Sequence, residues 1–403
     1  MGLLLASSRL AWIALGISLG LWALWEVSAY LARRTPLGSY TIFAIGVLFG
    51  VMFVYWMVSS TPGGVIVLLD QLPGSDNASS RLDVIRDFAK LAPDYPYTGG
   101  GLVALPGLYS QYIRVVPEYT INNSHNLFLN IALEQGYFGL GVFVLILLVS
   151  VWTLKKSQFD RYYRWAVLAG FFVLIIIGFA DDPFYGGRGM PLLLLLPGLA
   201  MALARVEEKT GDDISRTPVV HNVKLRWAII VGGLLLVILL AFSFRKPLVA
   251  GWYANLGAVQ MARYELDGFP TGEWDERGDL ESLGPSYDYF TRSIALNPLN
   301  FTAQHRMGLM AMRARDFEAA VSHLEVAYSL DPEHRGLRKV LGYAYLWTGQ
   351  FEKALPLMID IPWIEGEIRS YRKWWQAQGR GDLSKRADRM LDIVNGIERD
   401  AVP

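Results

Sequence analysis

A long polar loop of this chain ends, and an apolar segment begins, at Asn122-Asn123-Ser124-His125-Asn126-Leu127-Phe128-Leu129-Asn130. The segment runs on into Glu134-Gln135-Gly136-Tyr137-Phe138-Gly139-Leu140. A single histidine amid small polar residues, where the chain enters an apolar run, is costly to keep unless it has a use. We therefore expect the function of the chain to centre on this corner.

His125 and its neighbours allow two interpretations. A neutral imidazole can accept a proton near neutral pH, and the side chains of Asn123, Ser124 and Asn126 can bond a sugar or orient the ring. This is the interpretation as a catalytic base. The alternative is a histidine that caps the start of a helix for structural reasons.

The composition is that of an integral membrane protein. Of 403 residues, 53% are hydrophobic and 18% are charged, which is more apolar and less charged than a soluble domain. The net charge is zero, so no nucleic acid or other strongly charged partner is expected. The chain has no cysteine, which excludes disulfides, thiolate metal sites and cysteine nucleophiles.

Six apolar runs approach the ~20 residues that cross a bilayer. The basic clusters between the first and second, third and fourth, and fifth and sixth runs place those connections in the cytoplasm. The loop 60–135 and the tail after 244 are then outside. Met1 also falls outside, from which we expect that helices preceding the first run are missing. The predicted spans are 10–30, 40–59, 136–154, 164–181, 190–205 and 227–244.

The outer loop has internal structure. Residues 77–90 have the pattern of an amphipathic helix, and 105–114 have that of a second short one. Amphipathic pieces beside spans usually lie in the membrane interface. Between them Pro93-Asp94-Tyr95-Pro96-Tyr97-Thr98-Gly99-Gly100-Gly101 is a turn of helix-breaking residues, whose glycines indicate backbone freedom rather than a nucleotide cradle.

After the sixth run, similar residues recur 34 positions apart. This period is typical of the tetratricopeptide repeat. An interrupted first unit begins at Leu256-Gly257, and a final helix over 383–397 is expected to cap the array. The fold class is therefore all-α: a polytopic membrane bundle over 1–244 and a helical repeat domain over 245–403. The recurring pairs are Pro298 and Pro332, Gly308 and Gly342, Phe317 and Phe351, and Ala320 and Ala354.

Arginines at the predicted outer face could bind phosphate, because guanidinium forks match phosphate oxygens. The three candidates are Arg9, Arg81 and Arg188. The alternative is that they bind lipid headgroups. Asp181 and Asp182 could bind a metal, pair with Arg188 or cap the next segment. The remaining histidines are expected to be structural, and no cofactor or metal site is predicted. These remaining histidines are His221, His305, His323 and His334.

Three blocks of the sequence together resemble the O-antigen ligase and polymerase superfamily. Their order and spacing match that family over about 1–205. The blocks are Ser8-Arg9-Leu10-Ala11-Trp12; Arg81 with Pro96-Tyr97-Thr98-Gly99-Gly100-Gly101; and Ser124-His125-Asn126-Leu127-Phe128-Leu129 with Glu134-Gln135-Gly136 and Gly139-Leu140.

The resemblance implies a metal-independent glycosyltransferase with a GT-C-like membrane fold. Such proteins take a glycan from undecaprenyl diphosphate at the outer face of the bacterial inner membrane and pass it to a lipid, a glycan or a protein hydroxyl. By resemblance His125 would be the general base, and Arg9 and Arg81 would hold the diphosphate. Arg188 is added on its position alone. The chain departs from the family in having fewer helices before Arg9 and a repeat tail.

A different class of function remains open: a non-catalytic, membrane-anchored scaffold that recruits cell-envelope machinery through the repeats. Repeat arrays present a concave face, which could hold a glycan or a partner protein. The His-Asn block, the arginines and the glycine turn favour the enzyme, because an anchor has no need of them. A transporter would need ionisable residues in mid-span, and these spans have almost none.

Overall fold

The computed structural model is helical throughout the residues that it describes, with no strand among them. These residues fall into two compact units. Unit 1 comprises those within 1–86, 123–131 and 139–217, and unit 2 those within 87–122, 132–138 and 218–403. The described residues are 9–34, 38–60, 78–102, 104–112, 124–156, 160–180, 182, 185, 190–210, 231–232, 235, 239, 242–267, 281–361 and 363–400.

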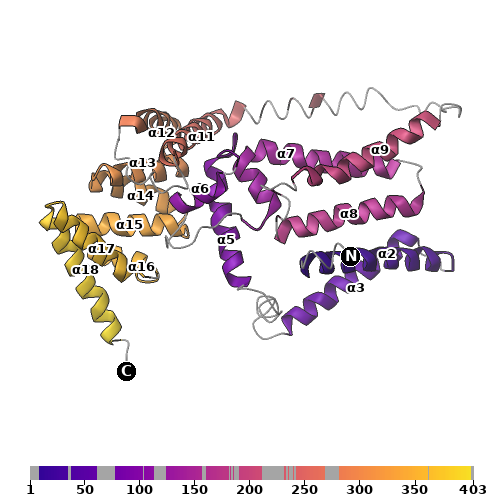
Figure 1. Cartoon of the computed structure of the whole chain (residues 1–403), viewed down its shortest axis with the longest axis horizontal. Coiled ribbons are helices and arrows are strands. Elements are labelled where there is room, and N and C mark those ends of the chain that lie inside the picture. Colours follow the sequence, from indigo (N-terminus) through magenta and orange to yellow (C-terminus); the bar gives the residue numbers. More distant parts are fainter. Residues whose placement is uncertain are drawn as a thin grey trace. The chain divides into compact units, whose positions relative to one another are not determined.

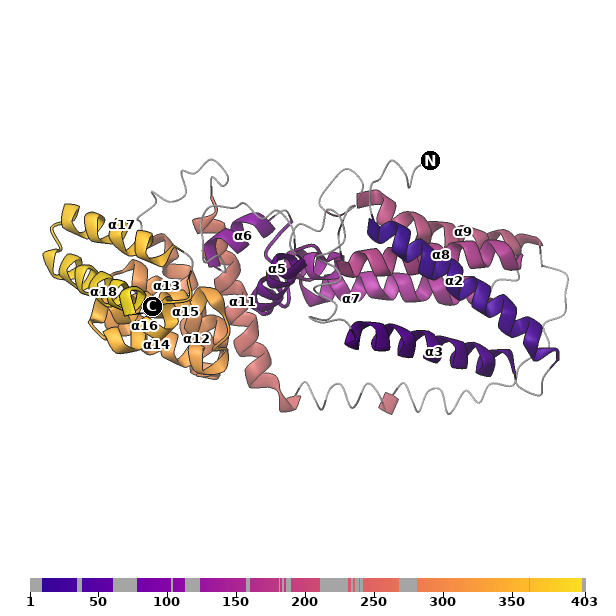
Figure 2. The ribbon, with the colours of Figure 1, turned by 90° about the horizontal axis from the view of Figure 1, so that it is seen from below.

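Unit 1 is a bundle of long apolar helices. Helix α2 packs against α3 and α8, and α8 packs against α9, as Figures 1 and 2 show. Trp25 of α2 lies at a junction, with its ring 5.1 Å from that of Tyr40 in α3 and 5.9 Å from that of Trp165 in α8. The helices are α2 (Arg9–Ala32), α3 (Ser39–Ser59), α7 (Leu127–Lys156), α8 (Arg161–Ala180), the 3₁₀ turn η2 (Met190–Leu194) and α9 (Leu195–Thr210).

Helices are present over each of the first five predicted spans. Helix α7 consists of two helical parts that meet at Gly136, whose backbone is not helical (φ 73°, ψ 176°). The second part starts at the predicted boundary of 136, and the first part, from Leu127, precedes the predicted span. Among the residues that the structure describes, three helices are long and apolar enough to cross a membrane, and Ser39–Phe53 and Met190–Leu203 are shorter apolar helices. The sixth predicted span, 227–244, lies largely outside the described residues. The three long ones are Leu15–Ala32, Leu127–Lys156 and Tyr162–Phe179.

Unit 2 contains the helical repeats, seen as the orange to yellow helices of Figure 1. Helices pair in order along the chain: α11 with α12, α13 with α14, α15 with α16, and α17 with α18. Helix α18 spans the predicted capping helix 383–397. The bounds are α11 (Arg245–Glu265), α12 (Gly284–Leu296), α13 (Phe301–Arg313), α14 (Phe317–Leu330), α15 (Arg335–Thr348), α16 (Phe351–Met358), α17 (Ile364–Ala377) and α18 (Gly381–Asp400).

The 34-residue period has a packing reason. A Cβ on Gly308 would lie 2.5 Å from the side chain of Leu324, and one on Gly342 would lie 2.5 Å from Met358. The two glycines therefore let each pair of helices approach closely. Ala320 and Ala354 are fully buried at equivalent positions.

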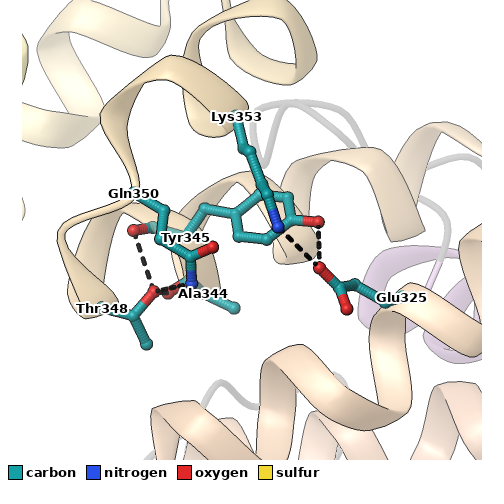
Figure 3. A network of polar contacts seen from close by, with 6 residues as sticks. All are labelled: Glu325, Ala344, Tyr345, Thr348, Gln350 and Lys353. Atoms are coloured by element: carbon teal, nitrogen blue, oxygen red, sulfur yellow. Dashed lines mark hydrogen bonds and ion pairs between the residues drawn. The ribbon is translucent and has the colours of Figure 1, made fainter.

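Polar contacts tie neighbouring repeats together (Figure 3). The hydroxyl of Tyr345 in α15 donates to Glu325 of α14 over 2.8 Å, and the ammonium of Lys353 in α16 donates to the same carboxylate over 3.1 Å. The Tyr345 bond, the first cause, and the Lys353 charge lower the pKa of Glu325, against an opposing effect of burial. Three helices thus share one carboxylate.

The two helices predicted in the loop 60–135 are present as α5 (Ala78–Leu91) and α6 (Leu105–Tyr112), and a 3₁₀ turn that was not predicted, η1 (Ala92–Asp94), follows α5. The apolar face of α5 was expected in the membrane interface. Phe88 is instead fully buried and its ring stacks on Tyr109 of α6 at 4.7 Å. Residues 87–112 belong to the same unit as the repeats.

Candidate functional site

His125 lies immediately before helix α7 with its backbone in the left-handed region, at φ 53°. A non-glycine residue pays about 1–2 kcal/mol for that conformation, although histidine is one of the types enriched there. Its side chain is half-buried. Strain of this kind persists where the surrounding structure enforces it, and it is concentrated at functional sites.

A buried hydrogen-bond network adjoins His125. It comprises Ser124, Asn130 and Asp182, and is called the polar lock below. The Oδ1 atom of Asn130 accepts hydrogen bonds from the backbone N–H of Ser124 (3.1 Å) and from its hydroxyl (2.5 Å). The Nδ2 atom of Asn130 donates to the carboxylate of Asp182. All three side chains are buried. The lock ties the turn before α7 to the segment that follows α8.

Asn126 holds the other side of His125. Its Oδ1 atom accepts from the backbone N–H of Leu129 (2.9 Å), which caps the start of α7. Its Nδ2 atom donates to the carbonyl of Phe179 near the end of α8 (3.1 Å). Asn126 therefore uses both ends of its amide to fix the backbone, so that orienting a sugar would be a second task for this side chain.

The other predicted site residues are not brought together by the described structure. Arg9 is the first residue of α2 and Arg81 lies in the first turn of α5. The side chains of both, and all of Asn123 and Arg188, lie outside the described residues. The binding of the diphosphate by Arg9, Arg81 and Arg188 thus stays a prediction.

Asp182 is engaged by Asn130, and Asp181 lies outside the described residues. Within the described ranges no group of three or more histidine, cysteine, aspartate or glutamate side chains could hold a metal ion. Asn130 is a functional candidate that sequence reasoning did not single out. Its signal was a polar residue one helical turn after Asn126, inside an apolar run.

The glycine blocks of the sequence meet each other in unit 2. The backbone N–H of Gly100 donates to the carbonyl of Leu133 (2.7 Å), and that of Tyr137 donates to Pro96 (2.8 Å). Gly99 and Gly136 both have positive φ, and a Cβ on Gly99 would overlap the backbone of Glu134. Side chains are therefore excluded where the 95–101 turn lies against the kink of α7.

An apolar cavity of about 300 Å³ opens in unit 1 between the start of α7, helix α8 and the η2–α9 segment. Leu127, Leu174 and Leu196 are among its walls, and Asp182 is the one ionisable residue among the described residues that line it. The same aspartate accepts from Asn130. The cavity and the polar lock are thus joined at one side chain.

Apolar helices and a helical repeat array define a multi-pass membrane protein with a repeat domain. Residues 1–144 match the protein family described as O-Antigen ligase, and residues 311–365 match the family described as Tetratricopeptide repeat. Both resemblances seen in the sequence are thereby confirmed. No curated protein and no solved structure matches the chain.

Proposed function

We propose that this protein transfers a glycan from undecaprenyl diphosphate to an acceptor hydroxyl at the outer face of the cytoplasmic membrane. The match of residues 1–144 to O-Antigen ligase supports glycan transfer. The single observation that carries the proposal is the strained backbone of His125, fixed between Ser124 and Asn126 within the matched region. A turn held this rigidly keeps a base in place.

In the proposed reaction the acceptor oxygen attacks the anomeric carbon of the donor sugar. His125 takes the proton of the acceptor hydroxyl, and the bond between the anomeric carbon and the diphosphate oxygen breaks. The electron pair of that bond leaves with undecaprenyl diphosphate. Attack opposite the leaving group inverts the anomeric carbon. No step uses a metal.

Charge grows on the diphosphate as it departs, and fixed cations stabilise such charge. We assign this role to Arg9, Arg81 and Arg188. Asn123, Ser124 and Asn126 are assigned to orienting the acceptor or the imidazole. The apolar cavity beside Asp182 supports the proposal of a lipid donor, because its walls suit a hydrocarbon chain.

The test is transfer by the full chain in liposomes that contain a polyprenyl-diphosphate-linked glycan, with acceptor lipid, glycan or protein added separately. We expect product with one acceptor class, and we expect Arg81→Ala to raise the KM for the donor more than that for the acceptor. Equal losses for both substrates would assign Arg81 a structural role. No product with any acceptor class would overturn the proposed function.

A scaffold without catalysis is the second candidate, and the match of residues 311–365 to the tetratricopeptide repeat favours it. Under that function His125 would be dispensable and the repeats would carry the activity. Deleting residues 122–130 cannot separate the two functions, because the deletion removes the start of α7 as well. A single exchange at His125 in the transfer assay does separate them.

A further inference from the structure

We propose that the repeat domain is an intramolecular clamp, which holds residues 87–98 and thereby positions the transfer site. The proposal rests on the proposed function. The clamp is defined by five repeat-domain residues that bind this segment: Asn255, Thr302, Arg306, Asp331 and Arg335. On this account the repeats act on their own chain, not on a recruited protein.

The deepest contact of the clamp is at Asp94 of η1. Its carboxylate accepts from the hydroxyl of Thr302 (2.6 Å) and from the guanidinium of Arg306, both in α13. The three side chains are buried. A buried ion pair requires specific geometry to offset desolvation, so Asp94 can stay buried without a large cost only when its segment is seated on α13.

Two further ion pairs hold the end of α5 against the connection between α14 and α15. The ammonium of Lys90 lies 2.6 and 2.8 Å from the two carboxylate oxygens of Asp331. The guanidinium of Arg335 donates to Asp87 over 3.0 Å, and the hydroxyl of Tyr109 donates to the same carboxylate over 3.1 Å. Helix α5 is thus held at two positions one turn apart.

The far end of the segment is held by α11. The side-chain oxygen of Asn255 accepts from the backbone N–H groups of Tyr97 (3.1 Å) and Thr98 (3.4 Å), and its amide donates to the Thr98 hydroxyl (2.8 Å). Asn255 is fully buried. One side chain thereby replaces the backbone partners that this turn lacks.

The clamped segment leads directly into the turn that fixes the α7 kink. Pro96 accepts from Tyr137, and Gly100 donates to Leu133, both through the backbone. Leu133 and Tyr137 belong to α7, the helix whose first turn follows His125. Release of residues 87–98 would free these bonds, so the clamp contributes to positioning and not to the chemical step.

The absence of cysteine makes the clamp measurable independently of activity. Ala92→Cys places one thiol at a position that is 2% exposed within the segment. We would measure its alkylation by a water-soluble maleimide in the full chain in liposomes, together with glycan transfer. The variants are Lys90→Glu, Asp331→Lys and the double charge exchange. Lys353→Glu, which breaks a pair with Glu325 outside the clamp, is the matched control.

We expect Lys90→Glu to raise the alkylation rate about tenfold by favouring local opening, and to lower kcat for transfer in parallel. The double exchange should restore both, and Lys353→Glu should change neither. Unchanged alkylation in Lys90→Glu would overturn the clamp. Increased alkylation with normal transfer would overturn its positioning role. Absence of transfer by the unsubstituted chain would overturn the proposed function, whatever the alkylation result.

Discussion

The guanidinium of Arg306 donates to the carboxylate of Asp94, which lies 212 positions earlier in the chain, and both side chains are buried. The contact joins a loop segment between predicted spans to the first helix of a complete repeat. It explains why residues 87–112 belong to the same compact unit as the repeats.

Removing one member of this pair leaves the other charge buried. We expect Arg306→Met to destabilise unit 2 by about 3–5 kcal/mol. The double variant Asp94→Leu with Arg306→Met should lose less than Arg306→Met alone, because no uncompensated charge remains. Thermal unfolding of the purified full chain, followed by tryptophan fluorescence, measures both. Tyr95→Phe, a neighbouring buried exchange, is the control. A double variant as unstable as the sum of the singles would contradict this account.

Much of the fold was predictable because its signals are local. Apolar runs gave the spans, and the 34-residue spacing of Gly308 and Gly342 gave the repeats, since both patterns follow from helix geometry. The pairing of Asp94 with Arg306 was not predictable, because two charged residues so far apart carry no pattern in a single sequence. Asn130 was missed for a similar reason: its partner Asp182 lies 52 positions later in the chain, beyond the end of α8.

The contact between the glycine turn and the α7 kink predicts a sharp difference among glycines. Gly99→Ala should cost about 2–4 kcal/mol, since it combines a positive φ with overlap against the Glu134 backbone, which cannot move aside. Gly141→Ala, which lies within α7 and has open space around it, should be neutral or stabilise by up to about 1 kcal/mol. Chemical unfolding of the two variants compares them. Similar stabilities would refute the close backbone approach.

The polar lock predicts that the buried side-chain amide of Asn130 supports both folding and glycan transfer. Asn130→Ala removes the acceptor for Ser124 and a donor to Asp182, so we expect a loss of about 1–3 kcal/mol. We also expect the rate of glycan transfer per folded molecule to fall, since the backbone at His125 loses its support. Ser150→Ala in the same helix removes only a bond to the carbonyl of Ile146 and should leave transfer normal. Normal transfer by folded Asn130→Ala would show that the lock is purely structural.

Two histidines of the repeats predict a pH dependence of stability. Burial, the first cause, lowers the pKa of His334 to about 4, and burial likewise lowers the pKa of His305 well below its usual value. As the pH falls, these histidines bind protons in the unfolded state before they do so in the folded state. Their contribution to the free energy of unfolding is therefore fully present above pH ~6.5 and is lost as the pH falls toward 4. Between pH 7 and 5 His334 alone should account for about 2 kcal/mol.

The matched variant is His334→Asn. His334 caps α15 by accepting from the backbone N–H of Leu337 (3.0 Å), and asparagine can make the same cap without titrating. We expect this variant to lose less stability between pH 7 and 5 than the unsubstituted chain, measured by unfolding midpoints at each pH. The same pH slope in both proteins would rule out His334 as the titrating group.

The central claim is that His125 takes the proton from the hydroxyl group of the acceptor. Its most direct test is the rate of glycan transfer by the variant His125→Asn. Asparagine tolerates the left-handed backbone at this position but cannot act as the base. His323→Asn, a half-buried histidine exchange in the repeats, is the control. With both proteins folded and inserted, we predict that His125→Asn transfers glycan about 10² to 10⁴-fold more slowly and that His323→Asn transfers normally. A normal rate for His125→Asn would contradict the claim.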